Sequence, residues 1–183
     1  SLSDGILRAQ AHETGQIIDD MRGFYATDVV GRVLAAKQAV TAIHNYRDVN
    51  GAIPIPATLS IELGNRISAR EDNVKYRFVS DYPFKGRAVH PLDAFELSAI
   101  RALRQDPTQP IIQVSGDIFD RSVRTATPII MSAPCVACHN SHPDSVKRDW
   151  KVGDVRGIQE ITIQQSIAAN ILAFKELLAY FCL

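Results

Sequence analysis

A chain of 183 residues, 46% of them hydrophobic, is long enough to bury a core and has the composition of a globular protein. Lysine and arginine together number 20, as do aspartate and glutamate, so the net charge is zero. Because a protein that binds nucleic acid through its phosphates needs a basic surplus, we expect no nucleic-acid partner.

The first fifty residues predict one long helix. Apolar residues recur at every fourth position and define the face that we expect to be buried: Ile17, Met21, Tyr25, Val29 and Val33. Asn50-Gly51 ends this helix, since glycine readily adopts the backbone conformation that closes a helix. Pro54 and Pro56 then predict a loop.

The rest of the chain alternates shorter helices and strands. Helices are predicted over residues 59–67 and, with Pro91 as the first helical residue, over 91–103. Four runs of β-branched or alternating apolar residues predict strands at 74–80, 111–115, 127–131 and 155–163. A closing helix is predicted over 166–183, where the apolar residues follow a heptad pattern: Ile167, Ile171, Phe174, Leu178 and Phe181.

This order of elements predicts an α+β protein. We expect a single domain over residues 1–183, with an N-terminal helix at 1–50, a core at 51–165 and a C-terminal helix at 166–183. The core is expected to hold a small antiparallel sheet flanked by helices. Residues 134–153 are expected to form a loop within it.

The most informative segment is Cys135-Val136-Ala137-Cys138-His139, a C-x-x-C-H run. This pattern is the attachment signal of a c-type haem. Two thiols three positions apart can each bond one vinyl group of the porphyrin, and the adjacent imidazole then faces the iron. We therefore predict haem c, with Cys135 and Cys138 as covalent anchors and His139 as an iron ligand.

Two other chemistries use a C-x-x-C pair. A structural zinc site needs a second pair of ligands at a recognisable spacing, and the third cysteine, Cys182, lies far away. A thioredoxin-like redox pair needs a strand–helix–strand context, whereas Pro134 and a polar segment flank this one. Haem attachment explains the spacing better than either.

The ligand on the opposite side of the iron determines whether the haem transfers electrons or binds a gas. The other histidines, the two methionines, Cys182 and a vacant position are all candidates. We favour His44, which lies at the end of the apolar stripe of the first helix. A histidine at such a place is more often a core or capping residue, but a haem that needs a partner offsets that expectation.

The haem propionates are anions and need basic partners. Arg156 is predicted as one such partner, and the single tryptophan, Trp150, is predicted to pack against the haem edge or its loop. The sequence shows no nucleophile elbow, phosphate loop or metalloprotease helix, so we do not expect an enzyme.

The residues around the motif resemble a known family, the c-type haem, PAS-like sensor domains. The resemblance rests on residues 134–145 and 149–157, on 53–58, 80–83 and 93–96, and on Phe24-Tyr25 with Val29-Val30 in the first helix. Such domains occur alone in cyanobacteria and as extracytoplasmic parts of bacterial histidine kinases, nucleotide cyclases and chemoreceptors. The resemblance implies a PAS-like antiparallel sheet, covalent haem at Cys135 and Cys138, and His139 as an axial ligand.

The same resemblance implies a sensor. We expect a periplasmic or extracytoplasmic domain that detects a diatomic gas or a redox state and signals through its terminal helices, in a homodimer. A monohaem electron carrier is the alternative. Since the sequence begins at Ser1 without a methionine or a visible signal peptide, we expect the targeting element and a membrane tether to lie outside this segment.

Overall fold

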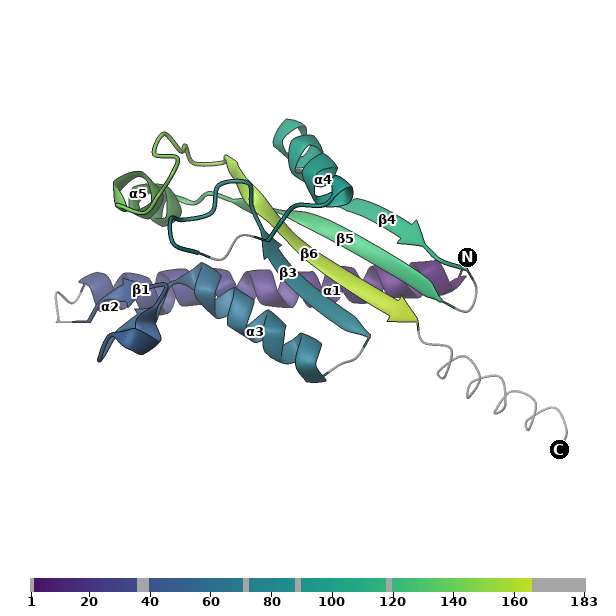
Figure 1. The fold of residues 1–183 in the computed structure, drawn as a ribbon, viewed down its shortest axis with the longest axis horizontal. Helices are drawn as coiled ribbons and strands as arrows, with labels where there is room; N and C mark the ends of the chain where they lie inside the picture. The colour runs from purple at the N-terminus through teal and green to yellow at the C-terminus, as the bar shows by residue number, and fades with distance from the viewer. Residues whose placement is uncertain (1, 36–39, 71–72, 88–89, 118–119, 166–183) are drawn as a thin grey trace, which may run out of the picture.

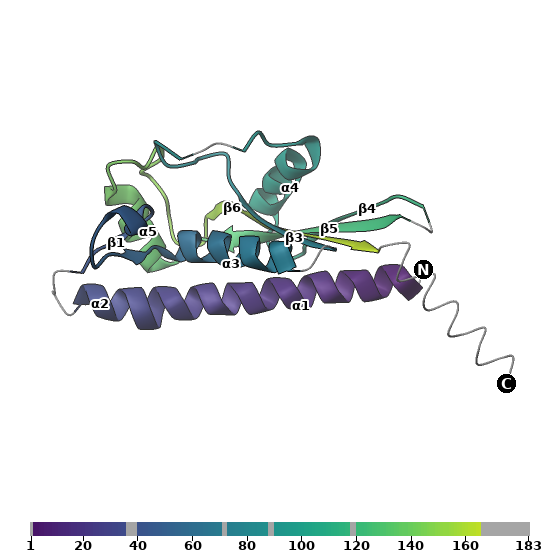
Figure 2. The ribbon, with the colours of Figure 1, turned by 60° about the horizontal axis from the view of Figure 1, so that its bottom comes forward.

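A four-stranded antiparallel sheet with helices on both faces forms the centre of the molecule (Figure 1). The computed structural model describes residues 2–35, 40–70, 73–87, 90–117 and 120–165. The strands lie in the order β3-β6-β5-β4. Figure 2 shows α1 along one side of the sheet and α4 on the opposite side. The predicted α+β class is confirmed.

The strands fall on the runs that the sequence predicted. They are β3 (Val74–Val79), β4 (Ile111–Ser115), β5 (Arg121–Ile130) and β6 (Val155–Gln165). Strand β5 begins at Arg121 rather than at residue 127, because its first half pairs with β4 although polar residues interrupt its apolar ones. A search for continuous apolar runs misses such a segment.

Two predicted helices are present but begin at other residues than expected. Helix α3 (Pro56–Arg70) begins at the second proline of the predicted loop, since proline fits the first helical turn. Helix α4 (Ala94–Gln105) begins after Pro91, because Asp93 caps it. The Asp93 carboxylate accepts the Glu96 N–H at 2.9 Å, and the Glu96 carboxylate accepts the Asp93 N–H at 2.8 Å. This reciprocal capping box sets where the helix starts.

The N-terminal helix is shorter than predicted. Helix α1 (Leu2–Phe24), the π-helical segment η1 (Tyr25–Gly31) and α2 (Arg32–Ala35) follow one another without a break. The chain then forms strand β1 (Ala42–Ile43) and the 3-10 turn η2 (Tyr46–Asp48) instead of remaining helical to residue 50. Strand β1 pairs in parallel with β2 (Ile53–Pro54), and this pairing requires extended backbone where a helix was expected.

The predicted buried face of this helix is also wrong. Ile17 and Met21 are 62% and 43% exposed, whereas Leu7, Ala11 and Ile18 are buried against the sheet. Gly15 belongs to the true buried stripe, and a Cβ atom there would lie 3.2 Å from Gln159 Nε2 and 3.3 Å from Ile161 Cδ1. Small residues that allow close approach carry little hydrophobic signal, so the periodicity of large side chains indicated the wrong face.

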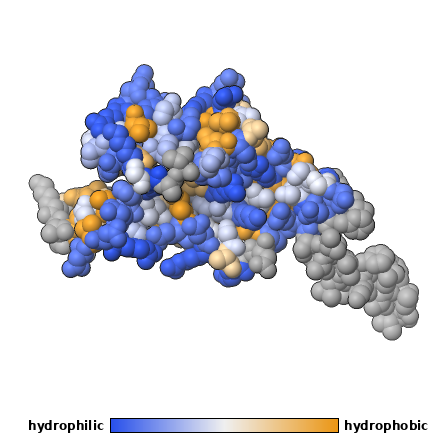
Figure 3. All heavy atoms as spheres, in the orientation of Figure 1, coloured by the Kyte–Doolittle hydropathy of each residue, from blue (hydrophilic) through white to orange (hydrophobic). Residues whose placement is uncertain are grey.

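Separate apolar clusters cover the two faces of the sheet. Helices α1 and α3 pack on one face around Val123, Ile161 and Ile163. Helix α4 packs on the other through Ala99 and Leu103. Figure 3 shows a mainly hydrophilic surface with hydrophobic side chains gathered over α4 and near α5 (Ala133–Ser141).

Among the helices that the structure describes, none is long and apolar enough to cross a membrane. The predicted C-terminal helix, 166–183, lies outside the described residues.

The close contact of α3 with β3 gives a stability prediction. A Cβ atom at Gly64 would lie 2.5 Å from the ring carbon Cγ of buried Tyr76, so Gly64→Ala is expected to destabilise the protein by roughly 1–3 kcal/mol in urea unfolding. Gly23→Ala is the matched control, because a Cβ at this α1 position meets nothing within 4 Å. It should stabilise the helix by roughly 0.5–1 kcal/mol, and equal losses in both variants would contradict the packing argument.

Candidate functional site

The C-x-x-C-H residues lie on α5, a short helix between β5 and β6. The sequence predicted a loop over 134–153, but residues 133–141 are helical, with Ser132 at the N-cap and Pro134 in the first turn. Positions i, i+3 and i+4 of a helix share one face, so Cys135, Cys138 and His139 lie together. Both cysteines are free thiols, and Cys138 is exposed.

Aromatic rings fix the position of His139. Its ring centroid lies 4.8 Å from that of Phe84, and His142 stacks on Phe84 at 4.9 Å. Phe84 is buried, and the neighbouring Lys85 N–H donates to the Asp144 carbonyl at 2.9 Å. The segment after β3 is thereby attached to the segment after α5.

The surroundings of His139 disfavour its charged form. Burial, with a smaller contribution from neighbouring positive charge such as that of Arg156, lowers the pKa of His139 from 6.5 to about 4. A neutral imidazole keeps one ring nitrogen with a free electron pair. This side chain is therefore suited to bind a metal ion at neutral pH.

Arg156, the predicted anion partner, is a buried cation beside His139. Its Nη1 donates to Ser80 Oγ, its Nη2 donates to the Tyr82 carbonyl, and its Nε donates to His139 Nδ1 at 3.4 Å. Burial lowers the pKa of Arg156 to about 10, so the guanidinium stays charged at neutral pH. The nearby charges that act on it are those of Asp81, Arg87 and Arg104.

Trp150 is buried at the same place, 4% exposed. Its ring centroid is 6.4 Å from that of His139, and Arg156 lies 5.5 Å from the centroid of the tryptophan ring. Asn140 holds the tryptophan backbone, since its side chain donates to the Trp150 carbonyl at 2.9 Å and accepts the Trp150 N–H at 3.0 Å. Trp150 thus lies against the motif helix, and its predicted packing on a haem edge stays a prediction.

A cavity opens in front of His139. It holds about 800 Å³ of space free of protein atoms, including its open mouth. Its walls are mainly apolar: Ile55, Ala57, Ile61, Phe78, Val79, Pro83, Phe84 and Leu92. Its polar and charged wall residues are Ser80, Arg87, His90, His139 and Arg156.

Two arginines of this wall have no carboxylate partner. Arg87 donates to Thr58 Oγ1 at 2.8 Å, and burial lowers its pKa. Neither Arg87 nor Arg156 forms an ion pair with an acidic side chain in the part of the chain that the structure describes. A buried cation, Arg156, and a half-buried one, Arg87, in a mainly apolar cavity favour a ligand that carries negative charge.

His44, the favoured second ligand, lies in the turn after β1 and is not among the described residues that line the cavity. Its Nδ1 is nevertheless buried without a hydrogen-bond partner in the described structure. Ile43 pairs with Pro54, so His44 and the cavity residue Ile55 each directly follow a residue of this pair. The role of His44 as a ligand stays a prediction.

The sequence profile of the Tll0287-like family (Tll0287) matches residues 7–164. The chain belongs to the Tll0287-like family. It is also similar to the crystal structure of the cyanobacterial heme-protein Tll0287, with a TM-score of 0.59 and 18% sequence identity over 90% of this chain and 97% of that chain. At this identity the likeness shows a shared fold. No curated protein matches the chain.

In this Tll0287-like chain, the segments that carried the family resemblance meet at the cavity. Residues 53–58 contribute Ile55 and Ala57, residues 80–83 contribute Ser80 and Pro83, and the motif contributes His139. Sequence reasoning did not single out Phe84 or Arg87 and included His90 only as one of several candidate ligands. A basic residue shortly after a strand-ending proline was the only signal for Arg87.

The low pKa of His139 predicts how the free Tll0287-like protein responds to acid. The unfolded chain takes up a proton near pH 6.5 and the folded protein near pH 4, so protonation between these values favours the unfolded state. Relative to His139→Gln, the wild type should lose about 1–2 kcal/mol of unfolding free energy between pH 6.5 and pH 4, after allowance for solvent screening. Urea unfolding at several pH values measures this difference.

The control is His12→Gln, at an exposed position on α1, which should keep the wild-type pH dependence. If the His139→Gln protein loses as much unfolding free energy between pH 6.5 and pH 4 as the wild type, the folded protein does not favour the neutral form of His139.

Proposed function

We propose that this Tll0287-like protein binds haem c in the cavity beside α5 and acts as a sensor. One observation carries the proposal: the imidazole of the C-x-x-C-H motif lines a mainly apolar cavity together with two arginines, buried Arg156 and half-buried Arg87, that form no ion pair with the acidic residues that the structure describes. The similarity to a structure described as a heme-protein supports the same cofactor.

The residues present fit a covalently attached haem. Cys135 and Cys138 are one helical turn apart and free, as two thioether bonds to one porphyrin require. The apolar wall suits the faces of the ring, and Arg87 and Arg156 suit its propionates. Haem would supply an iron atom that changes oxidation state or binds a gas, while the protein determines access and the axial ligands.

Arg156 and His139 would have to change their contact. As long as Nε of Arg156 donates to Nδ1 of His139, the imidazole carries its own proton on Nε2. A histidine that binds iron through Nε2 carries its proton on Nδ1 instead. This contact is therefore lost on iron binding, and the guanidinium becomes free to pair with a propionate.

The buried Nδ1 of His44 supports its role as the second axial ligand. An unpartnered buried polar atom costs free energy, and a bond to iron would remove that cost. His44 follows the residue that pairs with Pro54, and Ile55 of the cavity wall follows Pro54, which makes this bond compatible with the cavity.

The remaining parts of the proposal concern signalling. The antiparallel sheet flanked by helices supports a PAS-like architecture, and the α1 helix, which packs along the sheet, offers a route by which a change at the iron reaches another part of the protein. We place the domain in the periplasm or another extracytoplasmic compartment, in a homodimer tethered to a membrane, with no enzymatic activity of its own.

The first prediction concerns attachment. Replacement of both Cys135 and Cys138 by alanine removes the two thioether bonds, so acid butanone should extract all remaining haem from the variant and none from the wild type. Haem that stays with the doubly substituted protein after extraction would disprove the thioether assignment.

The second prediction concerns the propionates. In the Cys135→Ala/Cys138→Ala protein, Arg87→Gln should raise the dissociation constant of added haem by roughly tenfold to a hundredfold, the effect of losing a charge-assisted hydrogen bond. The control is Arg101→Gln, at an exposed position on α4 outside the cavity wall. Equal haem affinities of the two variants would show that Arg87 does not face a propionate.

Absorption spectra with and without carbon monoxide test the sensor role against the alternative. A gas sensor needs an iron ligand that carbon monoxide can displace in the ferrous protein. A spectrum that carbon monoxide leaves unchanged would favour a monohaem electron carrier.

A further inference from the structure

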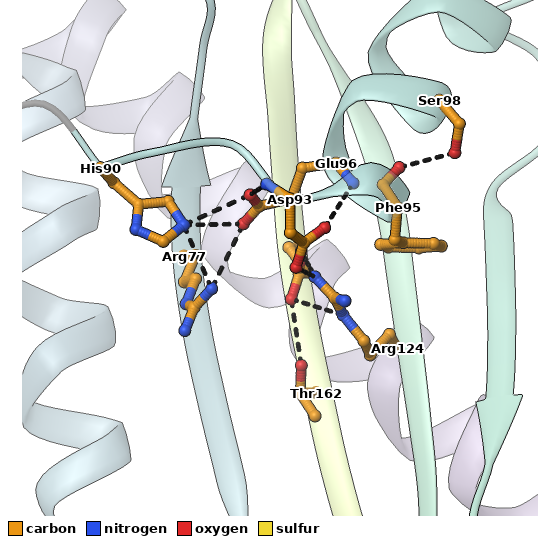
Figure 4. Close-up of polar contacts among 9 residues, drawn as sticks. Arg77, His90, Asp93, Phe95, Glu96, Ser98, Arg124 and Thr162 are labelled. Carbon is orange, nitrogen blue, oxygen red and sulfur yellow. Dashed lines mark hydrogen bonds and ion pairs between the residues drawn. The ribbon is translucent and has the colours of Figure 1, made fainter.

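A second histidine of the cavity wall, His90, is held by a buried carboxylate. His90 and His139 both line the cavity. The Nε2 atom of His90 lies 3.2 and 3.3 Å from the two carboxylate oxygens of Glu96, the first of which also lies 3.3 Å from Arg77 Nη1. The Glu96 side chain has no exposed surface, whereas that of His90 is 48% exposed. Figure 4 shows His90 and Arg77 on one side of Glu96 and Arg124 on the other.

The contacts of Nε2 bear on which ring nitrogen of His90 carries the proton. Arg77 Nη1, a donor, lies 3.3 Å from Nε2, but it also reaches Glu96 Oε1 at 3.3 Å, and both Glu96 oxygens accept hydrogen bonds, which favours a proton on Nε2. In that tautomer the Nδ1 atom has a free electron pair. Histidines that bind metals commonly donate their other N–H to a carboxylate, which orients the ring and makes it a stronger ligand. Glu96 thus prepares His90 to bind a metal ion through Nδ1.

Glu96 also belongs to the start of α4. Its carboxylate accepts the Asp93 N–H within the capping box, and the other carboxylate of the box, that of Asp93, accepts from Arg124 at 2.7 Å. Arg124 in turn donates to buried Glu160 of β6 at 2.8 and 3.1 Å. A displacement of His90 therefore removes a hydrogen bond from the carboxylate that caps the first turn of α4.

On the basis of the proposed haem site, we propose that His90 is an exchangeable axial ligand of the haem iron and that Glu96 transmits its capture to α4. When the ligand opposite His139 leaves, the Nδ1 electron pair of His90 forms the new bond to iron. No proton or electron is transferred, because the Nε2 proton is retained. As the ring moves toward the iron, its hydrogen bond to Glu96 weakens, and the first turn of α4 loosens.

The test uses the haem-loaded full chain in four forms: wild type, His44→Ala, His90→Gln and the double variant. His44→Ala should keep a six-coordinate, low-spin spectrum because His90 takes the vacant position. The double variant should become five-coordinate, high-spin. Carbon monoxide should bind it at least about tenfold faster than it binds His44→Ala, since nothing then competes for the iron.

Glu96→Gln in the His44→Ala protein separates the effect of Glu96 on His90 as a ligand from its effect on the folding of α4. Glutamine keeps the capping box, so α4 should still form, but a neutral amide makes His90 a weaker ligand. Carbon monoxide binding should speed up several-fold, as expected for a partial loss of the competing ligand. A readout apart from the haem is hydrogen exchange at residues 94–98, which should be faster in His44→Ala than in the double variant.

Two results would overturn the proposal. One is a five-coordinate His44→Ala protein whose carbon monoxide kinetics do not change when His90 is also replaced. The other is identical exchange at residues 94–98 in all four forms. A wild-type protein that carries no haem would instead disprove the proposed function itself, and this inference with it.

Discussion

The buried guanidinium of Arg156 is the interaction on which the arrangement of the site depends. A charge removed from water costs several kcal/mol unless hydrogen bonds compensate it. Here those bonds come from the segment after β3, through Ser80 and Tyr82, and from His139 on α5. The neighbouring Gly157 allows this, because a Cβ atom there would collide with the Val79 carbonyl and lie 2.9 Å from Ser80 Cβ. Strand β6 thereby fixes both the cavity wall and the motif helix.

The two faces of the sheet differ in chemistry. The face under α1 is filled mainly by aliphatic side chains, such as Ile18 and Ile161, and its buried polar pair, Tyr76 and Gln159, is uncharged. The face under α4 also holds two almost fully buried carboxylates, Glu96 and Glu160, paired with Arg77 and Arg124. Ion pairs of this kind are sensitive to the position of every member, whereas aliphatic packing tolerates small shifts. A change at the cavity therefore reaches α4 more readily than α1.

Much of the fold could be predicted from the sequence, because the periodicity of strands and short helices reflects burial directly. The four strands and α3 and α4 were located in this way, whereas a loop was predicted where α5 forms. The predictions failed where burial depends on small residues, as for Gly15 in α1, or where pairing overrides helix propensity, as for β1. Among the cavity residues, His139 and Arg156 were predicted and His90 was one of several candidate ligands, while Arg87 required the three-dimensional path of the segment after β3.

The strand order has a consequence for the time course of folding. In the described sheet, edge strand β3 pairs with β6, which is the last strand to be synthesised, and Ser80 and Arg156 meet across 76 positions of sequence. By contrast, β5, α5 and β6 follow one another directly and can associate through short loops. Contacts between distant positions form later than local ones, since more chain entropy is lost in closing the longer loop. The wall of the cavity that Ser80 and Arg156 join is thus expected to close after the local pairing of β5 with β6, so the motif helix between these strands forms before that wall is complete.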